Sequence, residues 1–372
     1  MFRTLLGKRE APPTVGEIND AAEEKIKEAI RSGDRLLSLE NLNLTNVPDL
    51  VAEAPQVHTL ILSRNRLSAI PDCVFELPKL RRLFLEDNQI NEFPASMGSL
   101  RNLQSLWLSG NPMGVIPDSI ADLENLRALH LYANGIALIP ESLGELHKLR
   151  DLELGGNQIA DVPDALSHLA QLRVLALYDN CLSAVPEAVR QLSLLEALKF
   201  FKNRITVIPE WLIELTHLEH LDLSDNEIST VPDFLADCSG MTALFLHGNV
   251  DLDVPDSKLG PTLDDCILGK KPLSPRKVIS NIRNFQTGRG KKIVHAGPTL
   301  EDLIKDLYAS YSGNREKAAR AIGSLGNVAI PAIPALRKAL KDPSGSVRNA
   351  AAWALLEIGS PEAKAAVAEY QS

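Results

Sequence analysis

The sequence predicts an α/β solenoid of short parallel strands, followed by a small all-helical unit. Three observations lead to this prediction. An asparagine recurs every 23 residues from Asn65 to Asn249, and the pattern L-x-L-x-x-N-x-[LIM]-x-x-[IVFL]-P surrounds it. A second, Ala-rich repeat begins near residue 298. A fixed period of this length indicates stacked units, each burying its apolar face against its neighbours.

Residues 1–33 are predicted to form an N-terminal tail and a helical cap. The stretch INDAAEEKIKEAIRSGD has a helical pattern, with Asp20 and Glu23 as a capping-box-like start and Gly33 as the stop. We expect this helix to cover the open edge of the first strand, because an uncovered edge invites pairing with other chains.

Residues 34–257 are predicted to form a solenoid of ten repeats. The two Leu of L-x-L point inward from a short strand, and the Asn amide bonds backbone groups of the adjacent coil that would otherwise be buried without partners. The first repeat has Leu42 in place of Asn, and the last has Asp251 in an apolar position. Atypical end repeats are expected, because they cap the stack.

These motifs resemble the leucine-rich repeat, in its 23-residue form whose copies end in Ile-Pro. Examples are LILSRNRLSAIP, LHLYANGIALIP and LDLSDNEISTVP. The resemblance implies a curved parallel sheet on the concave face and short helical turns on the convex face. It does not imply one function, because the scaffold serves many recognition tasks.

The prolines that end each repeat have a structural explanation. An acidic residue follows nine of the ten, and Ala95 is the exception. Proline suits the start of a short helical turn, and an acid there faces the positive end of the turn's dipole. These nine acids equal the whole formal net charge of −9, so that charge is no evidence for a basic partner.

Two adjacent phenylalanines fix the facing of one strand. Side chains on a strand alternate between its faces, so Phe200 in the second Leu position is predicted to be buried and Phe201 to be exposed on the concave face. Aromatic residues recur at the exposed positions of other repeats, and exposed aromatics on a rigid sheet are typical of binding hot spots. We therefore expect a protein or peptide to bind there, through Phe84, Trp107, His130, Tyr132, Glu153, Gly155, Tyr178, Lys199, Phe201, Asp222, Phe245 and His247.

The sixth repeat contains Gly155 and Gly156 between the positions of Tyr132 and Tyr178. Since adjacent strands lie about 4.8 Å apart, the tyrosines should stand roughly 10 Å apart across a floor without side chains. This predicts a slot for one inserted side chain of the partner. The alternative is that the two glycines only relax a tight turn.

Residues 258–297 are predicted to be a basic cap or linker. The stretch SPRKVISNIRNFQ has the pattern of a short amphipathic helix. A cap helix with a solvated charge run is one interpretation, and an anion site for nucleic acid, lipid or an acidic protein is the other. The basic residues are Lys270, Lys271, Arg276, Lys277, Arg283, Arg289, Lys291 and Lys292.

Residues 298–372 resemble HEAT-like repeats of the phycobilisome-lyase type. Arg315, Ala318 and Gly326 recur 33 residues later at Arg348, Ala351 and Gly359. Small residues let paired helices approach closely, and each Gly is expected to end the first helix of its pair.

Several function classes are not supported. No 18-residue apolar stretch and no secretory signal are found, the four cysteines are scattered, and a phosphate-loop spacing is absent. His220, Asp222 and His247 suggest a metal or catalytic patch, but no motif supports one. We expect a cytoplasmic, non-catalytic scaffold or inhibitor without cofactor or metal; nucleic acid is an unlikely partner. A secreted bacterial effector acting on a host protein, and anion binding through residues 270–292, stay open as alternatives.

Overall fold

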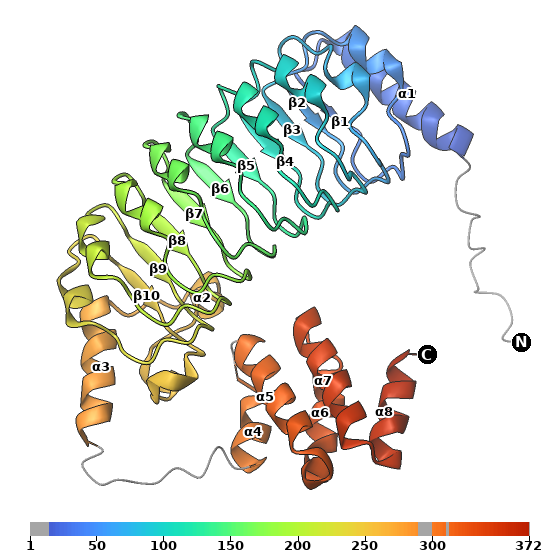
Figure 1. Ribbon diagram of the computed structural model, residues 1–372. Coiled ribbons are helices and arrows are strands. Elements are labelled where there is room, and N and C mark those ends of the chain that lie inside the picture. Colours follow the sequence, from blue (N-terminus) through green and yellow to red (C-terminus); the bar gives the residue numbers. More distant parts are fainter. Residues whose placement is uncertain (1–14, 289–299, 310–311, 372) are drawn as a thin grey trace, which may run out of the picture. The chain divides into compact units, whose positions relative to one another are not determined.

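The computed structural model describes residues 15–288, 300–309 and 312–371. These residues form two compact units, which divide after His220. Ten three-residue strands lie side by side in sequence order in one sheet (Figure 1). They are β1 Leu36–Ser38, β2 Thr59–Ile61, β3 Arg82–Phe84, β4 Ser105–Trp107, β5 Ala128–His130, β6 Asp151–Glu153, β7 Val174–Ala176, β8 Ala197–Lys199, β9 His220–Asp222 and β10 Ala243–Phe245.

The strands β1 to β8 pair in parallel, and equivalent residues of successive repeats lie opposite one another. Leu83 pairs with Leu106, for example, and Leu129 with Leu152. These central leucines are fully buried. The residues before and after them point to the other side, which we call the outer sheet face. The predicted burial of Phe200 is confirmed, because it is 0% exposed, whereas Phe201 is half-buried rather than exposed as predicted.

Short 3-10 turns lie on the side opposite the strands (Figure 1). Each of the ten prolines that end the repeat pattern directly precedes one of them, with a φ angle that a proline ring favours. The turns are Asp49–Glu53, Asp72–Val74, Ala95–Ser99, Asp118–Asp122, Glu141–Glu145, Asp164–His168, Glu187–Gln191, Glu210–Glu214, Asp233–Asp237 and Asp256–Lys258. Nine begin with an acid, as the sequence predicts.

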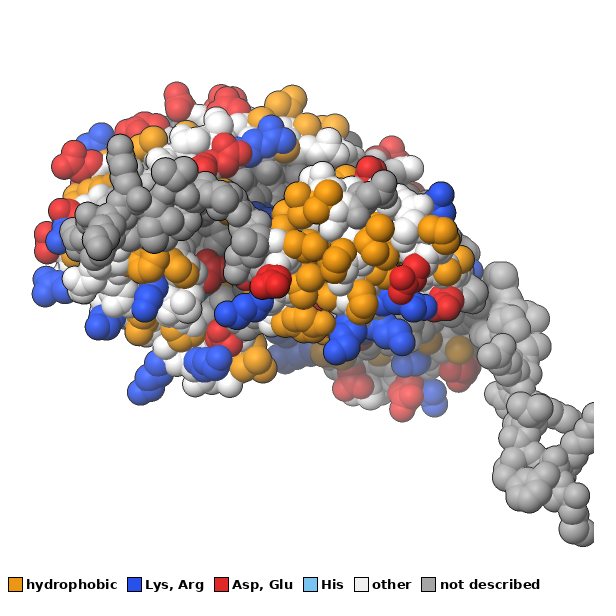
Figure 2. Space-filling model, turned by 90° about the horizontal axis from the view of Figure 1, so that it is seen from below, with side chains coloured by type: hydrophobic (Ala, Val, Ile, Leu, Met, Phe, Trp, Pro, Cys, Tyr) orange, Lys and Arg blue, Asp and Glu red, His pale blue; other side chains and the backbone are white. Residues whose placement is uncertain are grey.

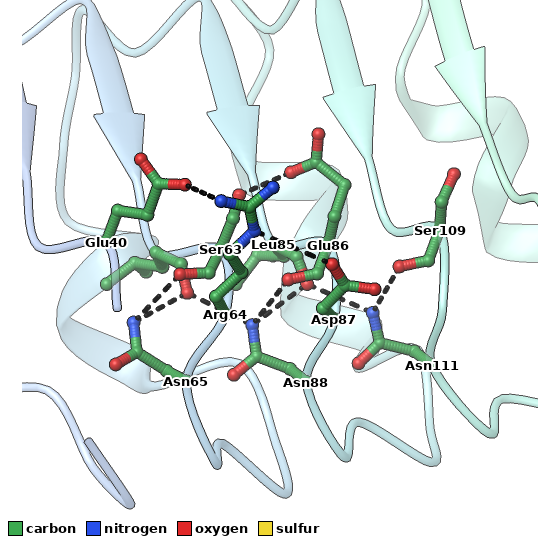
Figure 3. A network of polar contacts seen from close by, with 11 residues as sticks. Glu40, Ser63, Arg64, Asn65, Leu85, Glu86, Asp87, Asn88, Ser109 and Asn111 are labelled. Carbon is green, nitrogen blue, oxygen red and sulfur yellow. Dashed lines mark hydrogen bonds and ion pairs between the residues drawn. The ribbon is translucent and has the colours of Figure 1, made fainter. Parts of the chain in front are cut away.

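The recurring asparagines form a buried ladder, part of which is shown in Figure 3. The Asn65 amide donates to the carbonyls of Leu39 and Leu62 at 2.9 and 2.8 Å, and its Oδ1 accepts from the Leu44 amide at 2.9 Å. The same bonds recur at Asn88. Each asparagine therefore ties its own repeat to the preceding one and satisfies backbone groups in both.

The N-terminal helix α1 spans Val15–Ser32 and packs against β1 and the first 3-10 turn. Gly33, with φ +73°, ends it as predicted. The predicted start is wrong, because Asp20 lies in the second turn of the helix. The helical pattern continues upstream of the Asp20–Glu23 pair, so that pair lies inside the helix.

After β10 come α2 (Leu263–Ile267) and α3 (Pro275–Gly288). The α3 helix packs against β10 and the last 3-10 turns. Its residues Val278, Ile279 and Ile282 are buried. This is the packing expected of a cap helix on the last repeats.

The C-terminal helices are α4 (Leu300–Asp306), α5 (Ser312–Ser324), α6 (Ile333–Ala339), α7 (Gly345–Ile358) and α8 (Pro361–Gln371). The alanine-rich faces of α5 and α7 pack together around a common core. Gly326 and Gly359 adopt left-handed φ angles just beyond α5 and α7, as predicted for helix stops.

The two repeat-related arginines of this helical unit have structural roles. Arg315 donates two hydrogen bonds to the Asp342 carboxylate at 2.7 and 2.9 Å, and Arg348 donates to the carbonyls of Asp342 and Pro343.

Hydrophobic side chains gather on the face of the molecule that Figure 2 presents, with Lys and Arg side chains beside them. The exposed large apolar side chains among the described C-terminal residues are Tyr308, Leu325, Val328, Ile330, Trp353, Leu356 and Tyr370.

Candidate protein-binding site

Three neighbouring strands place a first group of stacked rings on the outer sheet face. The ring centroids of Phe84 and Trp107 lie 5.4 Å apart, and those of Trp107 and His130 lie 3.9 Å apart in a stacked arrangement. These residues end β3, β4 and β5, whose register sets them side by side. The His130 Nε2 lies 3.2 Å from a carboxylate oxygen of Asp151.

A second group of rings follows on the same face. Tyr178 and Phe201 stack at 4.3 Å with an angle of 6° between their planes, and Tyr132 lies 5.8 Å from Tyr178. Tyr132 is 40% exposed. The two groups together bring six of the predicted contact residues onto one face within the first unit. Packing of ring against ring restricts their rotamers before any partner arrives.

The predicted slot between Tyr132 and Tyr178 does not form. A Cβ on Gly155 would lie 2.5 Å from the Tyr178 ring, and a Cβ on Gly156 would lie 2.6 Å from the Tyr132 ring. The tyrosines lean over the glycines, so their rings occupy the space that the backbone spacing left open. Gly155 is consequently buried. Gly156 also takes the left-handed φ of +64° that recurs at this position of other repeats.

A partly buried carboxylate lies between the two ring groups. Glu153 accepts a hydrogen bond from the Gly155 amide at 2.9 Å. Burial raises the pKa of Glu153, although that hydrogen bond and the neighbouring charge of Lys199 oppose the shift. Burial and Glu153 together keep the pKa of Tyr178 above its usual range, so its hydroxyl stays protonated. The site thus combines apolar rings with one acid and one base.

Besides Gly155, three predicted contact residues are not accessible. Asp222, Phe245 and His247 are 6%, 3% and 1% exposed, so the expectation that they would be exposed is wrong. The segment after the last repeat supplies a reason, since the His247 Nε2 lies 3.0 Å from the Gly260 carbonyl oxygen. Asp222 accepts a bond from the Ser224 amide. These side chains support the end of the array.

Acidic partners neutralise much of the basic segment around α3. Lys270 lies 2.7 Å from Asp265, Arg276 lies 3.7 Å from Asp237, and Arg283 pairs with Asp233. The hydrogen bond from Arg283 lowers the pKa of Asp233. Lys271 and Lys277 are exposed, and Arg289, Lys291 and Lys292 lie outside the described residues.

Two kinds of reactive group, metal-ligand clusters and cysteine thiols, bear on catalysis in the part of the chain that the structure describes. No group of three or more His, Cys, Asp or Glu side chains there could hold a metal ion. All four cysteines are free. Burial raises the pKa of the Cys73 thiol to about 11 and also raises that of Cys266, so neither is primed as a nucleophile.

Comparison with known protein families agrees with this architecture. Residues 76–175 and 137–256 match the model of the leucine-rich repeat region, and residues 300–371 match the model of HEAT repeats. The chain carries leucine-rich repeats and HEAT repeats. Both repeat types typically act as non-catalytic binding scaffolds, and leucine-rich repeats commonly mediate protein–protein interactions. No helix among the described residues is long and apolar enough to cross a membrane.

Solved leucine-rich repeat structures share the fold. Internalin C2 of Listeria monocytogenes is 27% identical, with a TM-score of 0.51, over 64% of this chain and 98% of that protein. The functional domain of InlJ from the same organism is 19% identical, with a TM-score of 0.50, over 57% of this chain and 44% of that one. The comparison with curated proteins finds no match.

One row of the array carries basic residues that the repeat motif did not predict, namely the residues directly before the strands. It includes Arg35, Arg81, Arg127 and Arg150, all exposed. These basic residues are separated by 23 residues or more in the sequence. Their common position becomes apparent only when the second residue of each L-x-x-L-x-L motif is compared across all repeats.

Proposed function

We propose that the outer sheet face between β3 and β8 recognises a protein partner. The observation that carries the proposal is the pair of pre-stacked ring groups on neighbouring strands. Aromatic side chains are enriched among binding hot spots, and rings already held by one another lose little freedom on binding. The contact residues are Phe84, Trp107, His130, Tyr132, Glu153, Tyr178, Lys199 and Phe201.

The protein acts as a non-catalytic scaffold or inhibitor in this proposal, and it works in the cytoplasm. The four free cysteines support a reducing compartment. The leucine-rich repeat array supplies the rigid surface, because each repeat is fixed to its neighbour by the asparagine ladder. Rigid scaffolds favour affinity through pre-organisation.

The test is affinity capture from the native host with the full chain, followed by identification of the captured protein and a measured Kd. Tyr132→Ala and Phe201→Ala should each weaken binding by about 2 kcal/mol or more, as hot-spot aromatics do. Leu138→Ala is the matched control, because Leu138 is 76% exposed and lies outside the strands. A partner whose affinity is unchanged by both aromatic variants would place the interface elsewhere.

A further inference from the structure

The residues that precede the strands form a hydrogen-bonded ladder of their own. The amide of Arg81 bonds the His58 carbonyl at 2.9 Å, that of Gln104 bonds Arg81 at 2.7 Å, and that of Arg127 bonds Gln104 at 2.8 Å. The Arg150 amide continues the ladder to Arg127 at 2.8 Å. These residues therefore share one register, and their side chains leave the backbone about 4.8 Å apart. We call the surface made by Arg35, His58, Arg81, Arg82, Arg127 and Arg150 the basic edge.

The charge of the basic edge is not neutralised within the part of the chain that the structure describes. Arg35, Arg81, Arg127 and Arg150 are exposed, and none of them forms an ion pair there. The next arginine in the row, Arg173, differs because it pairs with Glu196. The row thus contains four exposed arginines over six repeats, and it becomes acidic at Glu196.

A hollow of about 380 Å³ lies at the start of the basic edge. Its lining has no carboxylate and consists of Arg35, Leu36, His58, Thr59, Arg81, Arg82 and Gln104. The Arg82 Nε donates to the Thr59 hydroxyl at 3.0 Å, which orients the guanidinium along the hollow. The His58 Nδ1 lies 2.8 Å from the Gln56 carbonyl oxygen, which fixes the imidazole ring. Three arginines thus converge on a space open to solvent.

The opposite edge of the same strands shows how this array neutralises an arginine elsewhere. There Arg64 lies between Glu40, at 3.5 Å, and Asp87, at 3.9 Å (Figure 3). Ser63 also donates to Glu86 on this edge. Acids of adjacent repeats therefore pair with Arg64 at this edge, whereas the exposed arginines of the basic edge form no ion pair within the described residues.

We infer that the basic edge binds an acidic, extended segment of the protein partner, which lies across the strand starts with carboxylates facing the arginines. The inference rests on the proposed function, because the segment belongs to that partner. An extended peptide presents side chains of one face about 6.7 Å apart, a spacing that long arginine side chains can match. Guanidinium groups also bind carboxylates through two parallel hydrogen bonds.

Nucleic acid fits this surface less well. Single strands are bound through aromatic faces on which bases stack, and here the rings of the outer sheet face are stacked on one another.

The test measures binding of a fluorescein-labelled decaglutamate peptide to the full chain by fluorescence anisotropy at low salt. Decaglutamate should bind, decaglutamine should not, and added salt should weaken the complex because exposed ion pairs are screened. Arg81→Glu combined with Arg127→Glu should reduce the affinity at least about tenfold. Lys271→Glu combined with Lys277→Glu makes the same change in charge around α3 and should alter the affinity less than about twofold.

Equal losses in the two double variants, or no loss in the first, would overturn the inference. A labelled 20-nucleotide single strand that binds more tightly than decaglutamate through the same arginines would overturn it in favour of nucleic acid. Melting curves accompany each variant, and Arg81→Gln with Arg127→Gln replaces the glutamate pair if that pair lowers the Tm. Decaglutamate has no apolar side chain, so this result is separate from the capture experiment on the stacked rings.

Discussion

Positive charge gathers in two regions that differ in their surroundings. Around α3, Lys270, Arg276 and Arg283 each meet an aspartate. On the basic edge, by contrast, Arg127 and Arg150 are neighbours with no acid paired to either in the described residues. Around α3 the basic residues are close together in the sequence, and three of them pair with acids. On the basic edge the arginines that precede the strands are 23 or more residues apart in the sequence, but they are aligned in the structure.

The difference shows that the fold decides whether a basic run is a binding surface. The apolar side of α3 packs on the last repeats, so Arg276 lies near Asp237 at the end of a 3-10 turn, and Arg283 pairs with Asp233, one of the acids that begin these turns. Those acids recur in nearly every repeat for structural reasons. The basic edge lies at the strand starts, away from the prolines that these acids follow.

The largest expected effect is a loss of stability that tests which strand residues face the interior. The alignment of the arginines on the basic edge depends on the same strand arrangement. Phe200→Ala should destabilise the fold by roughly 3–5 kcal/mol, because it truncates a fully buried aromatic side chain. Phe201→Ala should change stability much less, since its ring is half-buried on the outer sheet face. Urea unfolding of both variants measures the difference. Equal losses would mean that the facing of the strands, and with it the alignment of the arginines, is wrong.

The next effect tests the structural role of α3. Ile282→Asp should lower stability by about 3 kcal/mol, because it buries an unpaired carboxylate against the last repeats. Lys277→Asp introduces the same side chain on the exposed side of the helix and serves as the matched control. Thermal unfolding of the two variants compares them. Similar Tm values would show that α3 is not a cap.

The smallest effect concerns the repulsion between adjacent arginines. Arg127→Gln should raise stability by about 0.3 kcal/mol at low salt, because it removes a like charge beside Arg150. The gain should fade as salt increases. Lys271→Gln, in the segment before α3, should show no such gain. Denaturant midpoints at two salt concentrations measure both, and a loss of stability in Arg127→Gln would indicate that this arginine has a partner.

Sequence reasoning succeeded where backbone geometry alone sets the outcome. The 23-residue period fixes the strand order, the asparagine pattern predicts the buried amide bonds, and the alternation of a strand predicts the burial of Phe200. Gly33, Gly326 and Gly359 end helices because each adopts a left-handed angle that favours glycine.

Sequence reasoning failed where side chains or later segments decide. The strand spacing predicted that Tyr132 and Tyr178 would stand roughly 10 Å apart, but their ring centroids lie 5.8 Å apart and the rings close the expected slot. Phe245 and His247 occupy the outward positions of the last repeat, yet both are buried, and the His247 Nε2 lies 3.0 Å from the Gly260 carbonyl oxygen in the segment beyond the array. Neither result follows from a repeat considered alone.

The asparagine ladder has a consequence for how this molecule can change over evolutionary time. Each rung joins a repeat only to the one before it, so a whole 23-residue module can be duplicated or lost while every remaining rung closes again. An insertion of one residue would instead displace a backbone carbonyl and an amide from the asparagine side chain that bonds them. Loss of the module that contains Gly155 would bring Tyr132 and Tyr178 onto adjacent strands. Duplication or loss of complete repeats could therefore change which side chains lie on the recognition face while leaving the packing of the interior unchanged.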